Sequence, residues 1–257
     1  MGKKQSDIWA PLSQELEQWA GNECVAQLWL RDDDAIEVTP ALHRLDELCA
    51  SHEVPYTIAS IPNLVTAELA QWAKTRGLGA YCVHGFSHTN HAPVGEKKCE
   101  LGLHRGPEII IDELESGHQQ LSKMFGEQFV SLLVPPWNRI DHALIPHLSK
   151  IGFKALSTYG WPKTQASHDI KILNTHVDII DWKGTRGGLP IDQLVFDLVK
   201  AMQDARVIDA INPPAIGILS HHLVHNELAW KFLDELMAFC AANDQIIWKS
   251  ARDLASL

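Results

Sequence analysis

Two histidines four residues apart, His84 and His88, are the first chemical signal in the sequence. On one turn of a helix, side chains with this spacing point the same way and suit two ligands of one metal ion. Three adjacent carboxylates, Asp32, Asp33 and Asp34, repel one another and need a compensating metal ion or arginine. Two imidazoles and one carboxylate would leave a coordination position open for water, as in hydrolytic metal sites. The chain has 14 histidines, so such a pair also arises by chance, and the aspartates could instead cap a turn.

The elements that would carry these residues alternate between strands and helices. Apolar runs predict strands over 25–30, 56–60, 79–83, 129–134, 153–157, 171–177, 215–220 and 245–248, the first of them ending at Arg31. Helical spacing predicts helices over about 12–21, 40–52, 64–75, 107–125, 141–150, 191–205 and 227–242. Thr39 is expected to cap the second helix, with Pro40 as its first residue.

This alternation predicts a parallel sheet in an α/β fold. The length of 257 residues and the absence of a G-x-G-x-x-G loop favour a distorted (β/α)7-8 barrel over an open doubly wound sheet. We expect one domain over residues 1–257. A long polar loop from Gly85 to about Gly106 holds further histidines and acids, and it could cover a site or be solvated.

The carboxyl ends of the strands of such a barrel all lie on one face, where active sites are built. Chemically active side chains follow five of the predicted strands: Asp32–Asp34, His84 with His88, Pro136–Arg139, Asp178 with Asp181 and Trp182, and His221–His222. A purely structural role would scatter such residues over both ends. The sequence therefore predicts a single site at this face.

Composition excludes several classes of function. Lys+Arg 22 minus Asp+Glu 32 gives a net charge of −10, so nucleic acid and anionic membranes are disfavoured partners. No apolar run is long enough for a membrane span, and the N-terminal residues do not resemble a secretory signal. Five cysteines without a C-x-x-C pair favour reduced thiols and a cytoplasmic location. No oligomeric state is predicted.

The set of motifs resembles the polysaccharide deacetylase family, which is carbohydrate esterase family 4 with its NodB-homology domain. That family has five motifs on a distorted (β/α)7 barrel. Its Thr-Phe-Asp-Asp-Gly, His-(Ser/Thr)-x-x-His, Arg-x-Pro-Tyr, Asp-x-x-Asp-Trp and Leu-x-Leu-His motifs resemble Arg31–Ala35, His84–His88, Val134–Trp137, Asp178–Trp182 and Ile218–His221. Their order and approximate spacing hold from residue 25 to about 250, so the resemblance covers nearly the whole chain.

The resemblance implies that Asp33 is the catalytic base and that Asp34, His84 and His88 hold one divalent metal ion, with zinc preferred. A slip of one residue in the first motif would give these two roles to Asp32 and Asp33 instead. The metal would polarise the substrate carbonyl and activate a water molecule, from which the base removes a proton.

The resemblance also implies a general acid, His221, with His222 as the second choice. Asp178, Asp181 and Trp182 would line the site and orient its charged members. Histidine suits protonation of a leaving amine near neutral pH.

The third motif departs from the family pattern. Its arginine, which supports the base in the family, is replaced by Val134. We expect Arg31 or Arg139 to supply that charge, with Arg31 favoured as the partner of Asp181 or Asp178. Pro136 and Trp137 would lie beside the site, and Trp137, Trp161 and Trp182 could stack on sugar faces or pack in the core.

The expected function is a metal-dependent hydrolase that removes the N-acetyl group from an amino sugar. Its substrate would be an N-acetylated saccharide or glycoconjugate, for example one used in surface polysaccharide biosynthesis. Two alternatives stay open: hydrolysis of another C–N bond, such as a cyclic amide, and a non-catalytic barrel that binds metal or saccharide.

Overall fold

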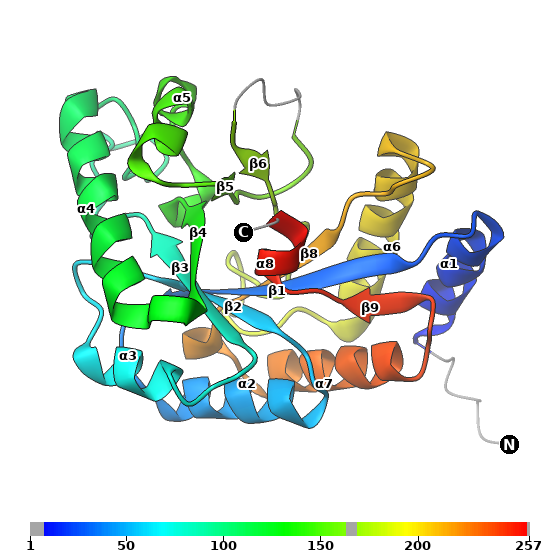
Figure 1. Ribbon diagram of the computed structural model, residues 1–257. Helices are drawn as coiled ribbons and strands as arrows, with labels where there is room; N and C mark the ends of the chain where they lie inside the picture. Colours follow the sequence, from blue (N-terminus) through cyan, green and yellow to red (C-terminus); the bar gives the residue numbers. More distant parts are fainter. Residues whose placement is uncertain (1–7, 163–168, 256–257) are drawn as a thin grey trace, which may run out of the picture.

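The structure is a computed structural model and describes residues 8–162 and 169–255. Parallel strands form a curved sheet in the order β6-β5-β4-β3-β2-β1-β8-β7, and β9 pairs with β1 outside this path (Figure 1). The strands are β1 (Ala26–Ala35), β2 (Tyr56–Ser60), β3 (Gly79–His84), β4 (Phe129–Val134), β5 (Ala155–Leu156), β6 (Lys171–Ile172), β7 (Val177–Asp178), β8 (Ile216–Ser220) and β9 (Ile246–Trp248). Within the described residues no ladder joins β6 to β7, so the sheet is a half-barrel.

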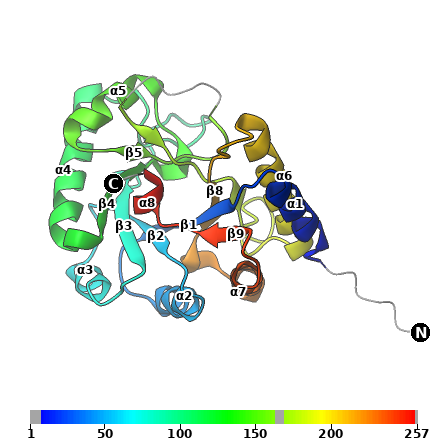
Figure 2. The same cartoon turned by 45° about the vertical axis from the view of Figure 1, so that its right-hand side comes forward.

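Helices cover the outer face of this sheet, and Figure 2 shows them as an arc around it. They are α1 (Ala10–Gly21), α2 (Pro40–Ser51), α3 (Ala67–Ala73), α4 (Pro107–Phe125), α5 (Ile145–Leu148), α6 (Ile191–Ile208) and α7 (Glu227–Ala241). The short α8 (Ala251–Ala255) lies inside the curve, where Ala251 and Ala255 pack with Trp29 of β1. The predicted distorted (β/α) barrel is therefore confirmed.

Local sequence explains most of these elements. The Thr39 hydroxyl accepts a hydrogen bond from the Leu42 amide at 3.0 Å and begins α2 before Pro40, as predicted. The predicted helix over 141–150 is wrong in detail, because it is divided into 3-10 turns around the four-residue α5. Pro146 lies there, and proline cannot donate a hydrogen bond inside a longer helix. The predicted strand over 171–177 is likewise two short strands, β6 and β7, and α8 was not predicted.

Strand β1 extends further than predicted and carries the charged residues within it. The strand was expected to end at Arg31 but continues to Ala35, because β8 pairs with it as far as Asp32 and β2 pairs with it, across a shift of register, as far as Ala35. Alternate residues of a strand face opposite sides of the sheet. Trp29 packs inside the half-barrel and Leu30 packs in the helix-covered core. This alternation points Arg31 and Asp33 into the barrel and Asp32 toward the helices.

In the described part of the chain, no helix has the length and apolarity that crossing a membrane requires.

Candidate active site

Asp34, His84 and His88 meet at the carboxyl ends of β1 and β3. Oδ1 of Asp34 lies 3.1 Å from Nε2 of His84 and 3.3 Å from Nε2 of His88. Within the described residues, these three form the one group of histidine, cysteine or acid side chains close enough to share a metal ion. The three predicted metal ligands are therefore brought together.

The hydrogen bonding of His84 makes this group suitable for a cation. Nδ1 of His84 lies 2.9 Å from the Val134 carbonyl oxygen, which can only accept, so Nδ1 carries the proton. In the neutral ring Nε2 is then an acceptor, facing a carboxylate oxygen that is also an acceptor. A proton or a metal ion must lie between them. Two ligands of a tetrahedral zinc ion lie about 3.3 Å apart, given Zn–N and Zn–O distances of about 2.0–2.1 Å, so the separations fit such an ion.

The pKa shifts within the group of Asp34, His84 and His88 also indicate that a proton or a metal ion belongs there. Burial raises the pKa of the Asp34 carboxyl, but the hydrogen bond and charge of His84 outweigh it and hold this pKa far below its usual range. Burial opposes charge on His84, yet the carboxylates of Asp33 and Asp34 raise its pKa. Burial, reinforced by His84, lowers the pKa of His88. Without a metal ion, the site thus draws a proton to His84.

The two histidines are brought together by a bend of the chain and not by the expected helical turn. His84 ends β3, Gly85 follows with φ +60°, and His88 has φ +55°. A side chain at Gly85 would collide with Glu100 and Pro136, so only glycine fits there. The buried Glu100 carboxylate accepts from the amides of Phe86 and Ser87 at 3.3 and 2.7 Å and holds the bend. Glu100 belongs to the polar loop from Gly85 to about Gly106, and its position there gave no signal of this function.

The register of the first motif follows from an irregularity in β1. The pairing of β1 with β2 shifts between Asp32 and Ala35, and Asp34 has φ +75°. This bulge turns Asp34 toward the histidines. Asp32 lies on the helix side of the sheet, so the structure places the Asp33 and Asp34 pair, and not the alternative Asp32 and Asp33 pair, in the site.

Asp33 is held by Arg31, two residues earlier on the same face of β1. Nη2 of Arg31 donates to Oδ2 of Asp33 at 3.0 Å, and Nε lies 2.9 Å from Oδ1. Arg31 is fully buried, and its Nη1 also donates to the Ser157 hydroxyl at 2.6 Å. The expectation that an arginine pairs with a site aspartate is confirmed for Arg31. Its favoured partners, Asp178 and Asp181, were wrong.

The predicted second choice, Arg139, does not take this role. Its Nη1 donates to the carbonyl oxygen of Lys98 at 2.7 Å, on the surface loop. Val134, which replaces the arginine of the third motif, offers only its carbonyl oxygen to His84.

The segment after β4 contributes two residues in the left-handed region. Trp137 has φ +55° and Asn138 has φ +56°, a conformation that is unfavourable for a bulky aromatic residue. Pro136 is buried before them. The Trp137 ring lies 4.5 Å from that of His88, and Oδ1 of Asn138 accepts from Nη2 of Arg31 at 2.7 Å. Asn138 lies inside the predicted segment Pro136–Arg139, but no role was expected for it, because its spacing is not distinctive.

His221 lies beside Asp33. Its Nε2 is 4.0 Å from Oδ2 of Asp33, and the Trp182 ring lies edge-on to its ring at 4.7 Å. Nε1 of Trp182 donates to Oδ2 of Asp178 at 2.8 Å. Burial raises the pKa of the Asp178 carboxyl, while the charge of His221 acts against this rise. Asp178, Trp182 and His221 thus form one wall of the site.

Two other predicted residues lie outside this arrangement. His222 is buried, and its Nδ1 bonds Oδ1 of Asp32 on the helix side of the sheet. Asp181 accepts from the amides of Gly184 and Thr185 at 2.9 and 3.0 Å and shapes its own turn. We find Asp178, and not Asp181, beside the histidine.

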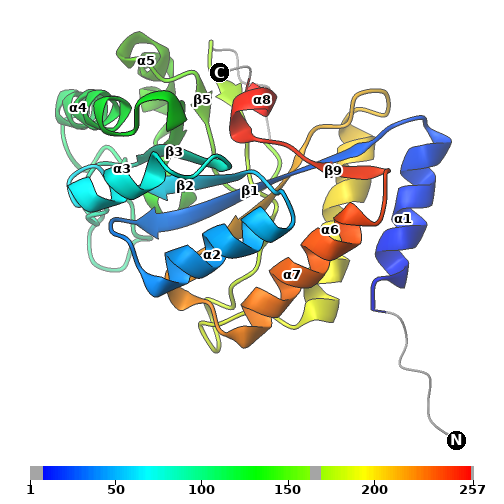
Figure 3. The same cartoon turned by 60° about the horizontal axis from the view of Figure 1, so that its bottom comes forward.

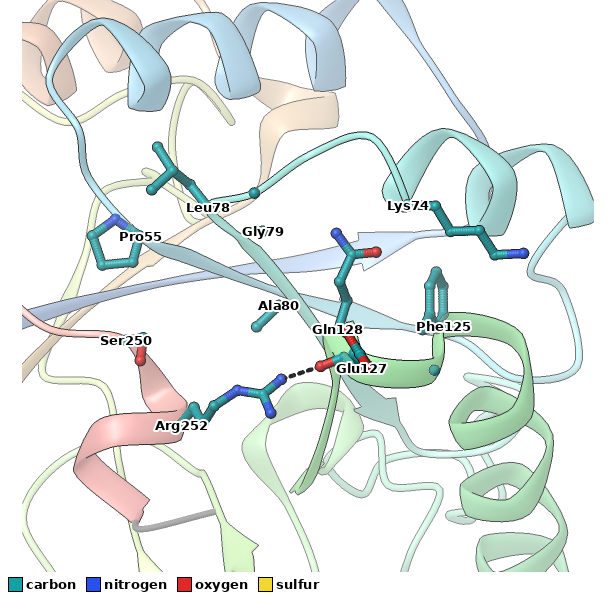
Figure 4. Close-up of a pocket in the computed structure, with 12 residues that line it drawn as sticks. Pro55, Lys74, Leu78, Gly79, Ala80, Phe125, Glu127, Gln128, Ser250 and Arg252 are labelled. Atoms are coloured by element: carbon teal, nitrogen blue, oxygen red, sulfur yellow. Dashed lines mark hydrogen bonds between the residues drawn. The ribbon is translucent and has the colours of Figure 1, made fainter.

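A separate pocket of about 620 Å³ lies at the opposite end of the barrel (Figure 4). It is lined by residues that begin β3 and precede β4, among them Gly79 and Gln128, with Arg252 from α8. The candidate ligand His84 ends β3, so this pocket takes no part in the site.

No sequence-family model matches, and no curated protein matches by sequence. A mutant with restored enzymatic activity of a carbohydrate esterase family 4 pseudoenzyme from Bacillus anthracis matches with a TM-score of 0.57 at 17% identity, over 90% of this chain and 68% of that chain. The chain has the carbohydrate esterase family 4 fold.

Two further solved structures with this fold come from named bacterial enzymes. A mutant of the peptidoglycan deacetylase PdaC from Bacillus subtilis matches with a TM-score of 0.55 at 15% identity, over 90% of this chain and 91% of that chain. A family 4 acetyl xylan esterase from Clostridium thermocellum, in complex with a cobalt ion, matches with a TM-score of 0.56 at 14% identity, over 90% of each chain. Identities this low establish the family 4 fold alone, and the fold serves both enzymes and a pseudoenzyme.

Proposed function

We propose that this protein is a metal-dependent hydrolase that removes the N-acetyl group from an amino sugar of a saccharide or glycoconjugate. One observation carries the proposal: Asp33 and His221 lie 4.0 Å apart, beside the group formed by Asp34, His84 and His88. A base, an acid and a set of metal ligands are what amide hydrolysis at neutral pH requires.

The ligands Asp34, His84 and His88 would hold one divalent ion, for which zinc fits the donor set. When bound, such an ion polarises the acyl carbonyl and the attacking water. Asp33 would accept a proton from the water that attacks the acyl carbon, and Arg31 keeps its carboxylate oriented. His221 delivers a proton to the departing amine. Trp137 and Trp182 would exclude water and contact the sugar.

The substrate class rests on the neighbours. The names of the peptidoglycan deacetylase and the acetyl xylan esterase give acetylated polymers as their substrates. This supports an acetylated saccharide as the substrate of the present protein. The choice of an N-acetyl amino sugar, a role in surface polysaccharide biosynthesis and a cytoplasmic location remain our predictions.

A non-catalytic barrel is the competing function, because the neighbours include a pseudoenzyme. The pairing of Asp33 with a buried arginine favours the enzyme. A barrel that only binds metal has no need of a carboxylate held in this way.

Acetate release tests the proposal. The panel contains N-acetylglucosamine oligomers, a peptidoglycan fragment and acetyl xylan, each with chelator, without it, and after zinc is restored. Asp33→Asn should keep the metal and lose about 10²–10⁴-fold of the activity, because an amide cannot take the proton. Metal binding without acetate release from any member would favour the non-catalytic barrel. Release from acetyl xylan alone would make the protein an O-acetyl esterase.

A further inference from the structure

Asp32 is a fully buried carboxylate that the proposed mechanism does not use. The alternation of β1 directs it away from the barrel interior, toward the layer of helices. Figure 3 shows α2 and α7 side by side in that layer. The charge of Asp32 also contributes, after burial, to raising the pKa of the Cys49 thiol in α2. Asp32 therefore lies between the sheet and the helices.

Within the part of the chain that the structure describes, the hydrogen bonds of this carboxylate all come from the two residues that flank His221. Oδ2 of Asp32 accepts from the Ser220 hydroxyl at 2.5 Å and from the His222 amide at 2.8 Å, and Oδ1 accepts from Nδ1 of His222 at 2.5 Å. His221 itself is left out of this group of bonds. We call Asp32, Ser220 and His222 the clamp.

The clamp begins where the sheet stops holding the chain. Asp32 and Ser220 are the last residues paired between β1 and β8, and β8 ends at Ser220. His221 follows with φ −145° and ψ 88°, before the 3-10 turn η5 (His222–Val224). The three bonds thus reinforce the last ladder pair at Ser220 and extend the link to β1 past His221, where the ladder has ended.

Stability is a weak explanation for this arrangement. A buried ion pair commonly contributes no more to stability than well-packed apolar residues of the same volume. The clamp instead fixes the distance between the side chains of Asp33 and His221. The strand that carries Asp33 is tied directly to the backbone that carries His221, and their side chains lie 4.0 Å apart.

We propose that Asp32 is a positioning residue that holds the His221 imidazole against Asp33 through the backbone on both sides of His221. This inference rests on the proposed function for the role of His221 as the acid, but the placement of the ring can be measured without any substrate.

The test compares three variants of the full chain. Asp32→Asn keeps the side-chain volume but turns one acceptor into a donor, so the clamp cannot form completely. Ser220→Ala removes one of the three bonds and is the milder change. Asp46→Asn is the matched control, because Asp46 is also a buried carboxylate, bonded to Tyr56 and Arg76 and away from the site.

NMR of histidine ring nitrogens reports the position of His221, with its signals assigned from their loss in His221→Gln. We expect shifted or doubled His221 signals in Asp32→Asn, a smaller change in Ser220→Ala and none in Asp46→Asn. For a substrate that the panel identifies, Asp32→Asn should lower kcat by about tenfold or more, because misplacement by about 1 Å is costly, while KM changes by less than about twofold.

The outcomes separate the two proposals. Unchanged His221 signals in Asp32→Asn, beside a lowered melting temperature, would overturn the clamp and leave Asp32 a structural residue. If Asp32→Asn does not fold, unchanged His221 signals in Ser220→Ala would overturn the clamp instead. A wild-type protein that releases no acetate, but whose His221 signals respond to the clamp variants, would refute the proposed function alone.

Discussion

The guanidinium of Arg31 and the carboxylate of Asp33 face each other from positions two apart on strand β1. Nη2 lies 3.0 Å from Oδ2, and Nε lies 2.9 Å from Oδ1. Residues at this spacing share one face of a strand, so the base and its counter-charge come from a single segment. Asp33 therefore needs no charged side chain at position 134, where Val134 stands in place of the arginine of the third motif.

Replacing Arg31 by lysine should separate the contribution of its positive charge to activity from the contribution of its hydrogen-bond geometry. Arg31→Lys keeps a positive charge but cannot contact Asp33, Ser157 and Asn138 together, because an ammonium group is a point donor. We expect activity to fall about 10- to 100-fold while metal content stays near that of the wild type. Arg139→Lys is the control, since that guanidinium donates to a loop carbonyl oxygen, that of Lys98, and not to Asp33. Equal losses in the two variants would contradict a special role for Arg31.

Removal of one histidine should remove the metal ion. His88→Ala should bind much less zinc than the wild type after chelation and reloading, because two ligands hold zinc far more weakly than three. Elemental analysis gives the stoichiometry, expected at about one ion in the wild type. His91→Ala removes a histidine from the same loop, outside the triad, and should keep the ion. Similar metal content in both variants would exclude His88 as a ligand.

Glu100 should control metal affinity without touching the metal. Its carboxylate holds the amides of Phe86 and Ser87, so Glu100→Gln loosens the bend that brings His88 to Asp34. Loss of a group that orients metal ligands typically weakens metal binding about 10- to 100-fold, and we expect that range here. Competition with a fluorescent zinc chelator measures it. Glu96→Gln, on the exposed part of the loop, should not change the affinity.

Alanine substitutions of the two adjacent histidines, His221 and His222, should affect different properties of the protein. His221→Ala should lose about 10²–10⁴-fold in kcat with little change in stability, because no hydrogen bond of its ring is found within the described residues. His222→Ala leaves the buried Asp32 carboxylate without its ring partner, and breaking such a pair costs about 3–5 kcal/mol. Kinetics and urea unfolding on both variants distinguish these effects. A stable His222→Ala protein that loses as much kcat as His221→Ala while its His221 ring signals stay unchanged would assign the acid to His222.

His176 should make the protein less stable in acid. Burial lowers its pKa from 6.5 to about 3, and its Nδ1 accepts a hydrogen bond from the Gly217 amide at 3.0 Å. The unfolded chain takes up a proton below pH 6.5 while the folded chain does not, so stability is full above this pH and declines as the pH falls toward 3.

His176→Asn keeps an acceptor for the Gly217 amide but cannot titrate. The loss of unfolding free energy between about pH 7 and pH 5 should therefore shrink by about 1–2 kcal/mol. Urea unfolding at several pH values measures this. An unchanged slope would show that His176 is protonated in the folded state as well.

Much of the fold could be predicted from the residues. The predicted bounds of β2 and β4 match the structure, and Thr39 caps α2, because these features depend on neighbours in the chain. The weaker predictions concerned segments whose ends depend on distant partners. Strand β1 extends through its aspartates because β2 and β8 pair with it, which no property of residues 31–35 reveals.

The sequence by itself determined which residue types stand at the strand ends, and hence that carboxylates, histidines and tryptophans would meet at one face of a parallel barrel. Only the tertiary structure decided which partner each of these side chains contacts. The direction of a side chain depends on strand alternation, on the bulge at Asp34 and on which group from another strand lies opposite. For this reason three consecutive aspartates have three different partners: Asp32 bonds His222, Asp33 pairs with Arg31, and Asp34 joins His84 and His88.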